Sequence, residues 1–231
     1  MTAVVESVQL SALIRAGSRA EHSAAESSEF IERLLDGRAK REEYAAYVRR
    51  LAAIYDALES VGHAYADDPA VATVVDPLLE RRDALAADLD YWAGPAWPDI
   101  PLDSPATAAY VARIGEAAAD WGGLYIAHHY TRYLGDLSGG QAIGRVVART
   151  YDLPAGVGTA FYEFAAIPKP KPYKDAYRSR LDSLELGEVD KQRIVSEVKL
   201  AFRLNESIFA ELTGGGGGRP RRSSRLSTGT P

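Results

Sequence analysis

Apolar residues recur every three to four positions over long stretches of this chain, which is the spacing of an amphipathic helix. The stretch from 41 to 66 shows this pattern clearly, and its spaced apolar residues are Tyr44, Val48, Leu51, Ile54, Tyr55 and Leu58. The strict alternation that is typical of strands is nearly absent. The pattern therefore predicts an all-α, multi-helix fold.

The same spacing predicts further helices at residues 9–36, 71–92, 104–120, 124–151, 173–184 and 188–212. Gly37 is placed to end the first of them, because glycine readily adopts the left-handed conformation of a C-cap. Pro77 predicts a kink or a restart in the helix over 71–92. Ser104 and Pro105 form a typical helix start, in which a hydroxyl caps the first turn and the missing proline N–H is not needed.

Three segments lack the helical spacing. Residues 94–101 (GPAWPDIP) and 153–172 are predicted to be loops from their glycine and proline content, with the PKPKP run extended. From residue 214 the composition changes to GGGGGRPRRSSRLSTGTP, which is too polar and too rich in glycine to pack. We therefore expect one domain over residues 1–213 and a disordered tail over 214–231, which solubilises the protein or touches acidic partners.

Composition narrows the class of protein. The 231 residues are 46% hydrophobic, without a run of about 18 apolar residues, so we expect a globular protein with no membrane anchor. The first residues lack the pattern of a secretion signal, which predicts a cytoplasmic protein. The net charge is −5, and removing the four arginines of the tail leaves −9, so no nucleic acid is expected to bind the folded body. The absence of cysteine excludes disulfides, thiolate metal sites and covalently attached haem.

The segment from 124 to 141, LYIAHHYTRYLGDLSGGQ, departs from the ordinary helical pattern. Gly135, Gly139 and Gly140 fall within six residues, and each costs about 1 kcal/mol relative to alanine in a helix interior. Such glycines are expected where a backbone bends or comes very close to another flat body. Asp136 lies between Gly139 and Gly140 around the helix axis, so the pattern places a carboxylate on a strip without side chains.

A polar stripe lies along the helix predicted over 9–36. Its members, at steps of four, three and four residues, are Arg15, Arg19, His22 and Glu26. One interpretation is a solvated ladder of ion pairs. The other is a metal site in which His22 is the axial ligand, Glu26 holds its other ring nitrogen, and the arginines bind anionic groups. The spacing alone leaves both interpretations open.

Other polar residues are weaker candidates. His63 lies near a predicted helix end, where a surface role is expected. His128 and His129 are adjacent and point about 100° apart, so at most one of them can face a given site. Lys174 and Arg178 are four residues apart and suit a carboxylate or a phosphate, although two solvated helix charges would look the same.

Taken together, these pieces resemble the haem oxygenases. The segment LYIAHHYTRYLGDLSGGQ is similar to the distal-helix signature of that family almost letter for letter, with His129 where many relatives carry a small residue. AEHSAAESSEF resembles the proximal-helix segment, YWAGPAWP an interhelical loop, and YKDAYRSRLDSLEL the basic helix late in the fold. The resemblance extends from Leu10 to Leu212, and it implies that residues 1–213 form a haem oxygenase catalytic domain.

The resemblance implies that haem b lies between the first helix and the glycine-rich helix. His22 would be the proximal iron ligand, with Glu26 near its outer nitrogen, and Phe202 would contact the haem. The residues implied over the open face of the iron are Gly135, Gly139 and Gly140. The residues implied as propionate contacts are Arg15, Arg19, Tyr130, Lys174 and Arg178. Two of these are arginines where relatives carry lysine, which keeps the charge and changes its reach.

The resemblance also makes Asp136 the centre of a water network with Tyr55, Arg132 and Asn205, although Asn205 read alone would be expected to bond locally. The reaction implied is oxidative cleavage of haem at a meso carbon, α being the expected one. The products would be biliverdin, carbon monoxide and Fe²⁺, so haem is both cofactor and substrate. The implied co-reactants are O2 and electrons from a ferredoxin or an NAD(P)H-dependent reductase, and we expect a monomer.

Two other functions are compatible with an all-α chain. A haem carrier or sensor could use the same pocket without turnover, which would require Asp136 or its network to be disabled. A thiaminase-like helical enzyme that binds no haem would need a nucleophile, which a chain without cysteine does not obviously offer. The presence of Asp136, Tyr55 and Arg132 favours the enzyme. The sequence does not distinguish iron acquisition, pigment synthesis and haem detoxification.

Overall fold

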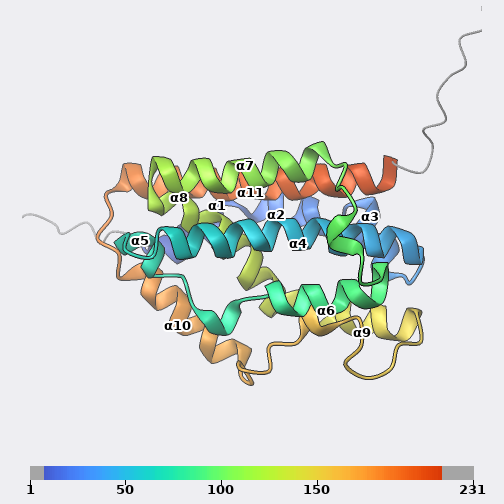
Figure 1. Cartoon of the computed structure of the whole chain (residues 1–231). Helices are drawn as coiled ribbons and strands as arrows, with labels where there is room; N and C mark the ends of the chain where they lie inside the picture. Colours follow the sequence, from blue (N-terminus) through green and yellow to red (C-terminus); the bar gives the residue numbers. More distant parts are fainter. Residues whose placement is uncertain (1–7, 215–231) are drawn as a thin grey trace, which may run out of the picture.

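The computed structural model describes residues 8–214, and the regular secondary structure in this part of the chain is entirely helical, as predicted (Figure 1). The α-helices are α1 (Leu10–Gly17), α2 (Arg19–Glu26), α3 (Glu29–Leu35), α4 (Arg41–Ala64), α5 (Pro69–Ala72), α6 (Arg82–Ala93), α7 (Pro105–Asp120), α8 (Gly122–His129), α9 (Gln141–Thr150), α10 (Pro170–Asp182) and α11 (Glu188–Gly214). Short helical turns are η1 (Pro77–Leu79), η2 (Trp97–Asp99), η3 (Tyr130–Leu134), η4 (Asp136–Gly140) and η5 (Ala160–Tyr162). The tail predicted to be disordered lies, apart from Gly214, outside the described residues.

The long helices α4 and α11 form the frame on which the others pack. Figure 1 shows α7 and α11 side by side along one edge of the molecule, with α4 beneath them and α6, α9 and α10 on the far side of α4. The apolar stripe predicted on α4 is fully buried, from Tyr44 to Leu58. Burying each such side chain contributes about 1.5–3 kcal/mol, so this stripe fixes how α4 is oriented in the fold.

The prediction of a single helix over 9–36 is wrong, because the chain forms three short helices there. The breaks fall at serines: the Ser18 hydroxyl donates to the Ile14 carbonyl at 2.8 Å, and the Ser27 hydroxyl donates to the Ser23 carbonyl at 2.9 Å. Serine side chains that bond the backbone in this way compete with the helical ladder. Gly37 has a φ of +69° just beyond α3, so its predicted role as a C-cap glycine is confirmed.

Other boundaries follow proline and capping chemistry. The chain restarts at Pro77, and the Thr107 amide donates to the Ser104 hydroxyl at 3.2 Å, as predicted. The prediction that the whole PKPKP run is extended is wrong, because α10 begins at Pro170. Proline is tolerated in a first helical turn, where its missing N–H would have no partner.

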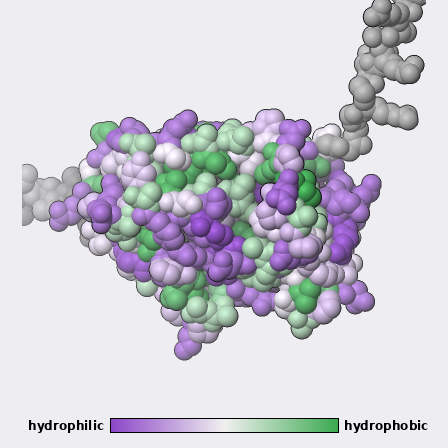
Figure 2. Space-filling view, viewed as in Figure 1, coloured by the Kyte–Doolittle hydropathy of each residue, from purple (hydrophilic) through white to green (hydrophobic). Residues whose placement is uncertain are grey.

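The surface is mixed. Figure 2 shows hydrophilic and hydrophobic residues interspersed on the face it presents. Within residues 8–214, no helix is sufficiently long and apolar to cross a membrane.

Candidate functional site

The glycine-rich segment is the most irregular helical stretch of the fold. The helix predicted over 124–151, with a bend at its glycines, runs as α8, then as two wider π turns, η3 and η4, and then as α9. π turns inside helices are rare and occur mainly at functional sites. Gly135 has ordinary helical dihedral angles, φ −61° and ψ −50°, so its backbone does not require glycine. The reason for glycine must therefore lie in the space beside it.

The predicted glycines fall into two groups by what surrounds them. A Cβ atom built on Gly135 or Gly139 would meet no atom within 4 Å beyond its own helix, and both residues are exposed. Gly140 is buried, and a Cβ there would lie 3.2 Å from the Tyr162 ring. Gly135 and Gly139 thus form an open strip of backbone, whereas Gly140 has a packing role that the sequence did not reveal.

Four residues predicted to act together behind this strip are joined by direct contacts. The Tyr55 hydroxyl donates to the Asp136 carboxylate. Arg132 donates from Nη1 to Asn205 Oδ1 at 2.8 Å and from Nε to the Tyr55 hydroxyl at 3.3 Å, and its Nη2 lies 4.0 Å from Asp136 Oδ1. Asn205 also donates to the Ala201 carbonyl, so it is satisfied both locally and in the network.

The electrostatics of this network favour a carboxyl that can hold a proton. Burial raises the pKa of Asp136, and the neighbouring Arg132 and Tyr55 act in the opposite direction. Burial also raises the pKa of the Tyr55 hydroxyl well above its usual value. A carboxyl with a raised pKa, connected to other hydroxyl and guanidinium groups, is suited to proton delivery.

His22 lies on α2, a helix without buried residues, with 53% of its side chain exposed. Its Nδ1 lies 3.2 Å from a Glu26 carboxylate oxygen, and its ring meets the Phe202 ring edge-on at 5.5 Å between centroids. These two contacts orient the imidazole and leave Nε2 for a ligand, which is the arrangement of a metal-binding histidine. Arg19 is exposed at the start of the same helix.

Helix α11 brings the two halves of the site to one side of the molecule. Phe202 contacts His22, while Asn205, three residues further along α11, bonds Arg132. Residues three apart on a helix lie on the same face. His22 and the π turns therefore face the same side of α11, although they are more than 100 residues apart in the sequence.

Cations surround the edge of this region. Lys174 donates to the Ser138 hydroxyl at 2.9 Å, which ties α10 to the turn that carries the open strip. Burial raises the pKa of the Tyr130 hydroxyl, and the guanidinium groups of Arg178 and Arg15 oppose that rise. The structure thus brings Tyr130, Arg178 and Arg15 together, and Arg15 is exposed. This grouping is suited to anionic groups of a ligand.

The other three histidines are engaged elsewhere. His63 is mostly exposed and pairs with Glu80 at 2.7 Å, which confirms its predicted surface role. His128 and His129 are both buried in the core, where they bond Glu197 and Tyr177 respectively at 2.9 Å. The described residues contain no group of three or more side chains able to hold a bare metal ion. A single ligand such as His22 suits a metal that brings its other ligands with it, as in haem.

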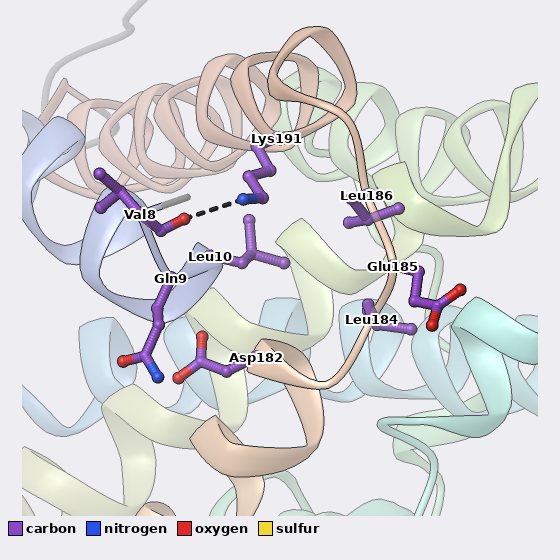
Figure 3. Close-up of a pocket in the computed structure, with 8 residues that line it drawn as sticks. All are labelled: Val8, Gln9, Leu10, Asp182, Leu184, Glu185, Leu186 and Lys191. Carbon is purple, nitrogen blue, oxygen red and sulfur yellow. Dashed lines mark hydrogen bonds between the residues drawn. The ribbon is translucent and has the colours of Figure 1, made fainter. Parts of the chain in front are cut away.

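A cavity of about 490 Å³ lies near the start of α1 and the end of α10 (Figure 3). It is lined by the start of α1, the end of α10 and the connection to α11, including Leu10, Asp182 and Leu186. Lys191 at its wall donates to the Val8 carbonyl at 2.9 Å. None of the predicted site residues lines this cavity.

Sequence reasoning missed three residues that support the site. Ser138 holds Lys174, Tyr162 packs against Gly140, and Tyr177 bonds His129. Tyr162 lies in the segment predicted as a loop, where no periodic signal marked it. Tyr177 stood between Lys174 and Arg178 in the sequence, which was the available signal for a role beside those cations.

Proteins of known family resemble this chain in both sequence and structure. A family model described as "Heme oxygenase" matches residues 8–211. Heme oxygenase 2 of Synechocystis sp. is 39% identical over 86% of this chain and 81% of its own length, and heme oxygenase 1 of Nostoc sp. is 39% identical over 87% and 84%. The crystal structure of heme oxygenase-2 from Synechocystis sp. in complex with heme and NO superposes with a TM-score of 0.86 at 38% identity, covering 90% of this chain and 86% of that one. Heme oxygenase from Leptospira interrogans gives a TM-score of 0.83 at 37% identity, covering 88% and 100%.

Proposed function

This chain belongs to the heme oxygenase family, and we propose that it cleaves haem b oxidatively at a meso carbon to give biliverdin, carbon monoxide and Fe²⁺. The observation that supports this function most directly is the pairing of two surfaces on one side of α11. One surface presents an oriented, half-exposed imidazole, and the other presents a bare backbone strip in front of a buried acid network. Solved relatives of similar fold hold heme, which supports the same ligand here.

The residues present fit haem as the ligand. His22 would hold the iron through Nε2, because Glu26 engages its Nδ1. Phe202 would support the imidazole and the ring from α11. The residues that would hold the propionates are Arg15, Arg19, Tyr130, Lys174 and Arg178. When bound, haem supplies both the iron that activates O2 and the ring that is oxidised.

The open strip determines which groups reach the reacting side of the ring. Gly135 and Gly139 allow the backbone to approach closely while excluding bulky side chains. Arg132 is held back by Asn205 and Tyr55, so its charge stays within the network. No guanidinium of this network is therefore directed at the strip, so none would donate directly to a molecule held in front of it.

Asp136 would deliver protons to the reacting side of the site. Its raised pKa allows the carboxyl to hold a proton, and the Tyr55 hydroxyl and Arg132 orient it. Proton transfer by a positioned side chain typically contributes about 10²–10⁴-fold to a rate. The alternative of a carrier or sensor without turnover is not favoured, because it would require this network to be disabled, and the network is intact.

The reaction requires O2 and electrons from outside the chain. A ferredoxin or an NAD(P)H-dependent reductase is the expected electron donor, and the cytoplasm is where both are available. Iron acquisition, pigment synthesis and haem detoxification all remain compatible with this chemistry.

The proposed function is tested by adding haemin to the purified protein and following the Soret band. We expect a one-to-one complex with histidine ligation, and then, with a reductase, NADPH and O2, loss of the Soret band and formation of biliverdin. Chromatography and mass spectrometry identify the bilin, and a gas assay detects carbon monoxide. A stable haem complex that yields no bilin under these conditions would support the carrier instead.

A further inference from the structure

A buried hydrogen bond links α10 to the glycine-rich segment. His129 is 3% exposed and stands at the end of α8, and its Nδ1 lies 2.9 Å from the hydroxyl of Tyr177 on α10. The two rings are also stacked, with centroids 5.8 Å apart and planes 12° apart. Tyr177 is completely buried. The contact is therefore a defined, buried hydrogen bond between two elements of the proposed site.

The surroundings of His129 keep its imidazole neutral. Its ring packs against Tyr133 at 4.4 Å and against Tyr125 at 5.9 Å between centroids. Burial lowers the pKa of His129 to about 3, and the charge of Arg180 acts in the same direction. The imidazole is therefore neutral at physiological pH, and its bond to Tyr177 is a fixed feature of the fold.

Tyr177 is one of the side chains that anchor α10, the helix that carries the two cations. Tyr177 and Leu181 are the buried residues of this helix, while Lys174 and Arg178 lie three residues before and one residue after Tyr177. A shift of this part of α10 against the glycine-rich segment would move both cations together, because they lie on either side of Tyr177 on the same helix. The Tyr130 and Tyr177 rings also meet, with centroids 6.4 Å apart. The bond from Lys174 to Ser138 is exposed and is expected to resist displacement less than the buried bond.

We propose that the His129–Tyr177 bond is a positioning device that fixes the in-plane orientation of haem and so selects the meso carbon that is attacked. This inference rests on the proposed function. The propionates mark one edge of the ring, so the cations that bind them determine which meso carbon lies beneath the open strip. Small displacements of a positioning group change reactivity strongly, because the reacting atoms must stay within a narrow range of distances.

The test compares His129→Leu and Tyr177→Phe with the parent protein. Leucine fills most of the imidazole volume without hydrogen bonding, and phenylalanine removes only the hydroxyl. We expect both variants to change the ratio of bilin isomers by about fivefold or more, since a typical hydrogen bond has that effect on an equilibrium. The haem methyl resonances in the proton NMR spectrum of the ferric complex should show a second seating in both variants. The double variant should add little to either single change.

His128→Leu is the matched control. His128 is the adjacent buried histidine, but its hydrogen bond goes to Glu197 on α11 instead of to α10. This variant should lose comparable stability while keeping the parent isomer ratio and a single set of haem methyl resonances. Parent-like isomers and resonances in both His129→Leu and Tyr177→Phe would overturn the proposal. Tyr177→Phe preserves the packing and carries the test if His129→Leu does not fold.

The NMR measurement separates this inference from the proposed function. A parent protein that binds haem in one seating but forms no bilin would contradict the proposed enzyme. The seating of haem in the variants would still decide whether the His129–Tyr177 bond positions the ring.

Discussion

The two surfaces that face each other across the proposed site are built in opposite ways. Helix α2 has no buried residue, and its histidine is oriented by one carboxylate and one ring edge. The glycine-rich segment is mostly buried, and only a narrow strip around Gly135 and Gly139 is exposed. The half of the site on α2 is therefore nearly independent of the core, whereas the half on the glycine-rich segment is part of the core.

This difference predicts how substitutions act. On α2, a side chain can be removed with little effect on the free energy of unfolding, because it makes few buried contacts. In the glycine-rich segment, the side chains that serve chemistry also satisfy buried polar groups, so function and stability change together.

The largest effect on function is expected for His22→Ala. Loss of the imidazole should abolish the spectrum of histidine-ligated haem and the turnover that depends on it. The free energy of unfolding of the haem-free protein should change by no more than about 0.5 kcal/mol, since the residue is half exposed. Visible spectra of the haem complex and urea unfolding measure the two effects, and an unchanged spectrum would contradict the assignment of His22.

Asp136→Asn should give the next largest effect. The variant keeps the shape of the side chain but loses the acid, so we expect haem to bind and biliverdin formation to fall by about 10²–10⁴-fold. Arg132 would also lose its buried carboxylate partner, at an expected cost of about 1–3 kcal/mol in stability. Single-turnover assays and urea unfolding test both parts. Full activity in Asp136→Asn would refute proton delivery by this residue.

Two glycine variants test the difference between the open strip and the packed core. Gly139→Ala should stabilise the haem-free protein by up to about 1 kcal/mol, since alanine favours helix and its Cβ would meet nothing. The same Cβ should weaken haem binding, because it occupies the proposed contact surface.

Gly144→Ala is the counterpart within the core. Its Cβ would lie 3.0 Å from the Tyr162 Cβ, so we expect a loss of about 1–3 kcal/mol in stability without a direct effect on haem contacts. Thermal unfolding and haemin titration of both variants measure the difference. Equal haem affinity for Gly139→Ala and the parent would show that the strip does not touch the ligand.

Much of the fold follows from burial on one side of a helix. The stripe from Tyr44 to Leu58 predicted α4, because its apolar residues recur at the helical spacing and each of them is buried in the core. The stripe on residues 15–26 predicted His22 and Glu26 as a pair, and their contact needs only local helical geometry. The network around Asp136 came from the resemblance to a family, since Tyr55 and Asn205 lie 81 and 69 residues away in the sequence.

The features that the sequence did not reveal depend on tertiary contacts. The breaks at Ser18 and Ser27 arise from hydroxyls that could equally have faced solvent. Tyr162 acquires its role only where it meets Gly140 and Gly144. The bond between His129 and Tyr177 joins residues 48 positions apart. No periodicity within one helix reports such pairings.

The last effect concerns the pH dependence of stability rather than activity, and it distinguishes the buried half of the site from α2. The pKa of His129 is about 3 in the folded protein, against about 6.5 when unfolded. Between these values the unfolded chain binds more protons, so stability is lost as pH falls through this window, by up to about 1.4 kcal/mol per pH unit. His129→Gln keeps a hydrogen-bonding side chain beside Tyr177 but cannot titrate, so its stability should fall less steeply.

The cleanest range for this measurement is pH 7 to 5. Hydrogen bonds from His128 and Arg113 overcome the effect of burial and lower the pKa of Glu197 to about 2, so this carboxylate adds its own pH dependence only below about 4.5. Urea unfolding of the haem-free parent and of His129→Gln at several pH values should therefore give diverging stabilities above that point. Parallel curves would mean that His129 gains its proton over the same pH range in the folded and the unfolded chain. The glycine-rich segment would then hold a charged imidazole in its buried interior, which we expect only for the exposed histidine of α2.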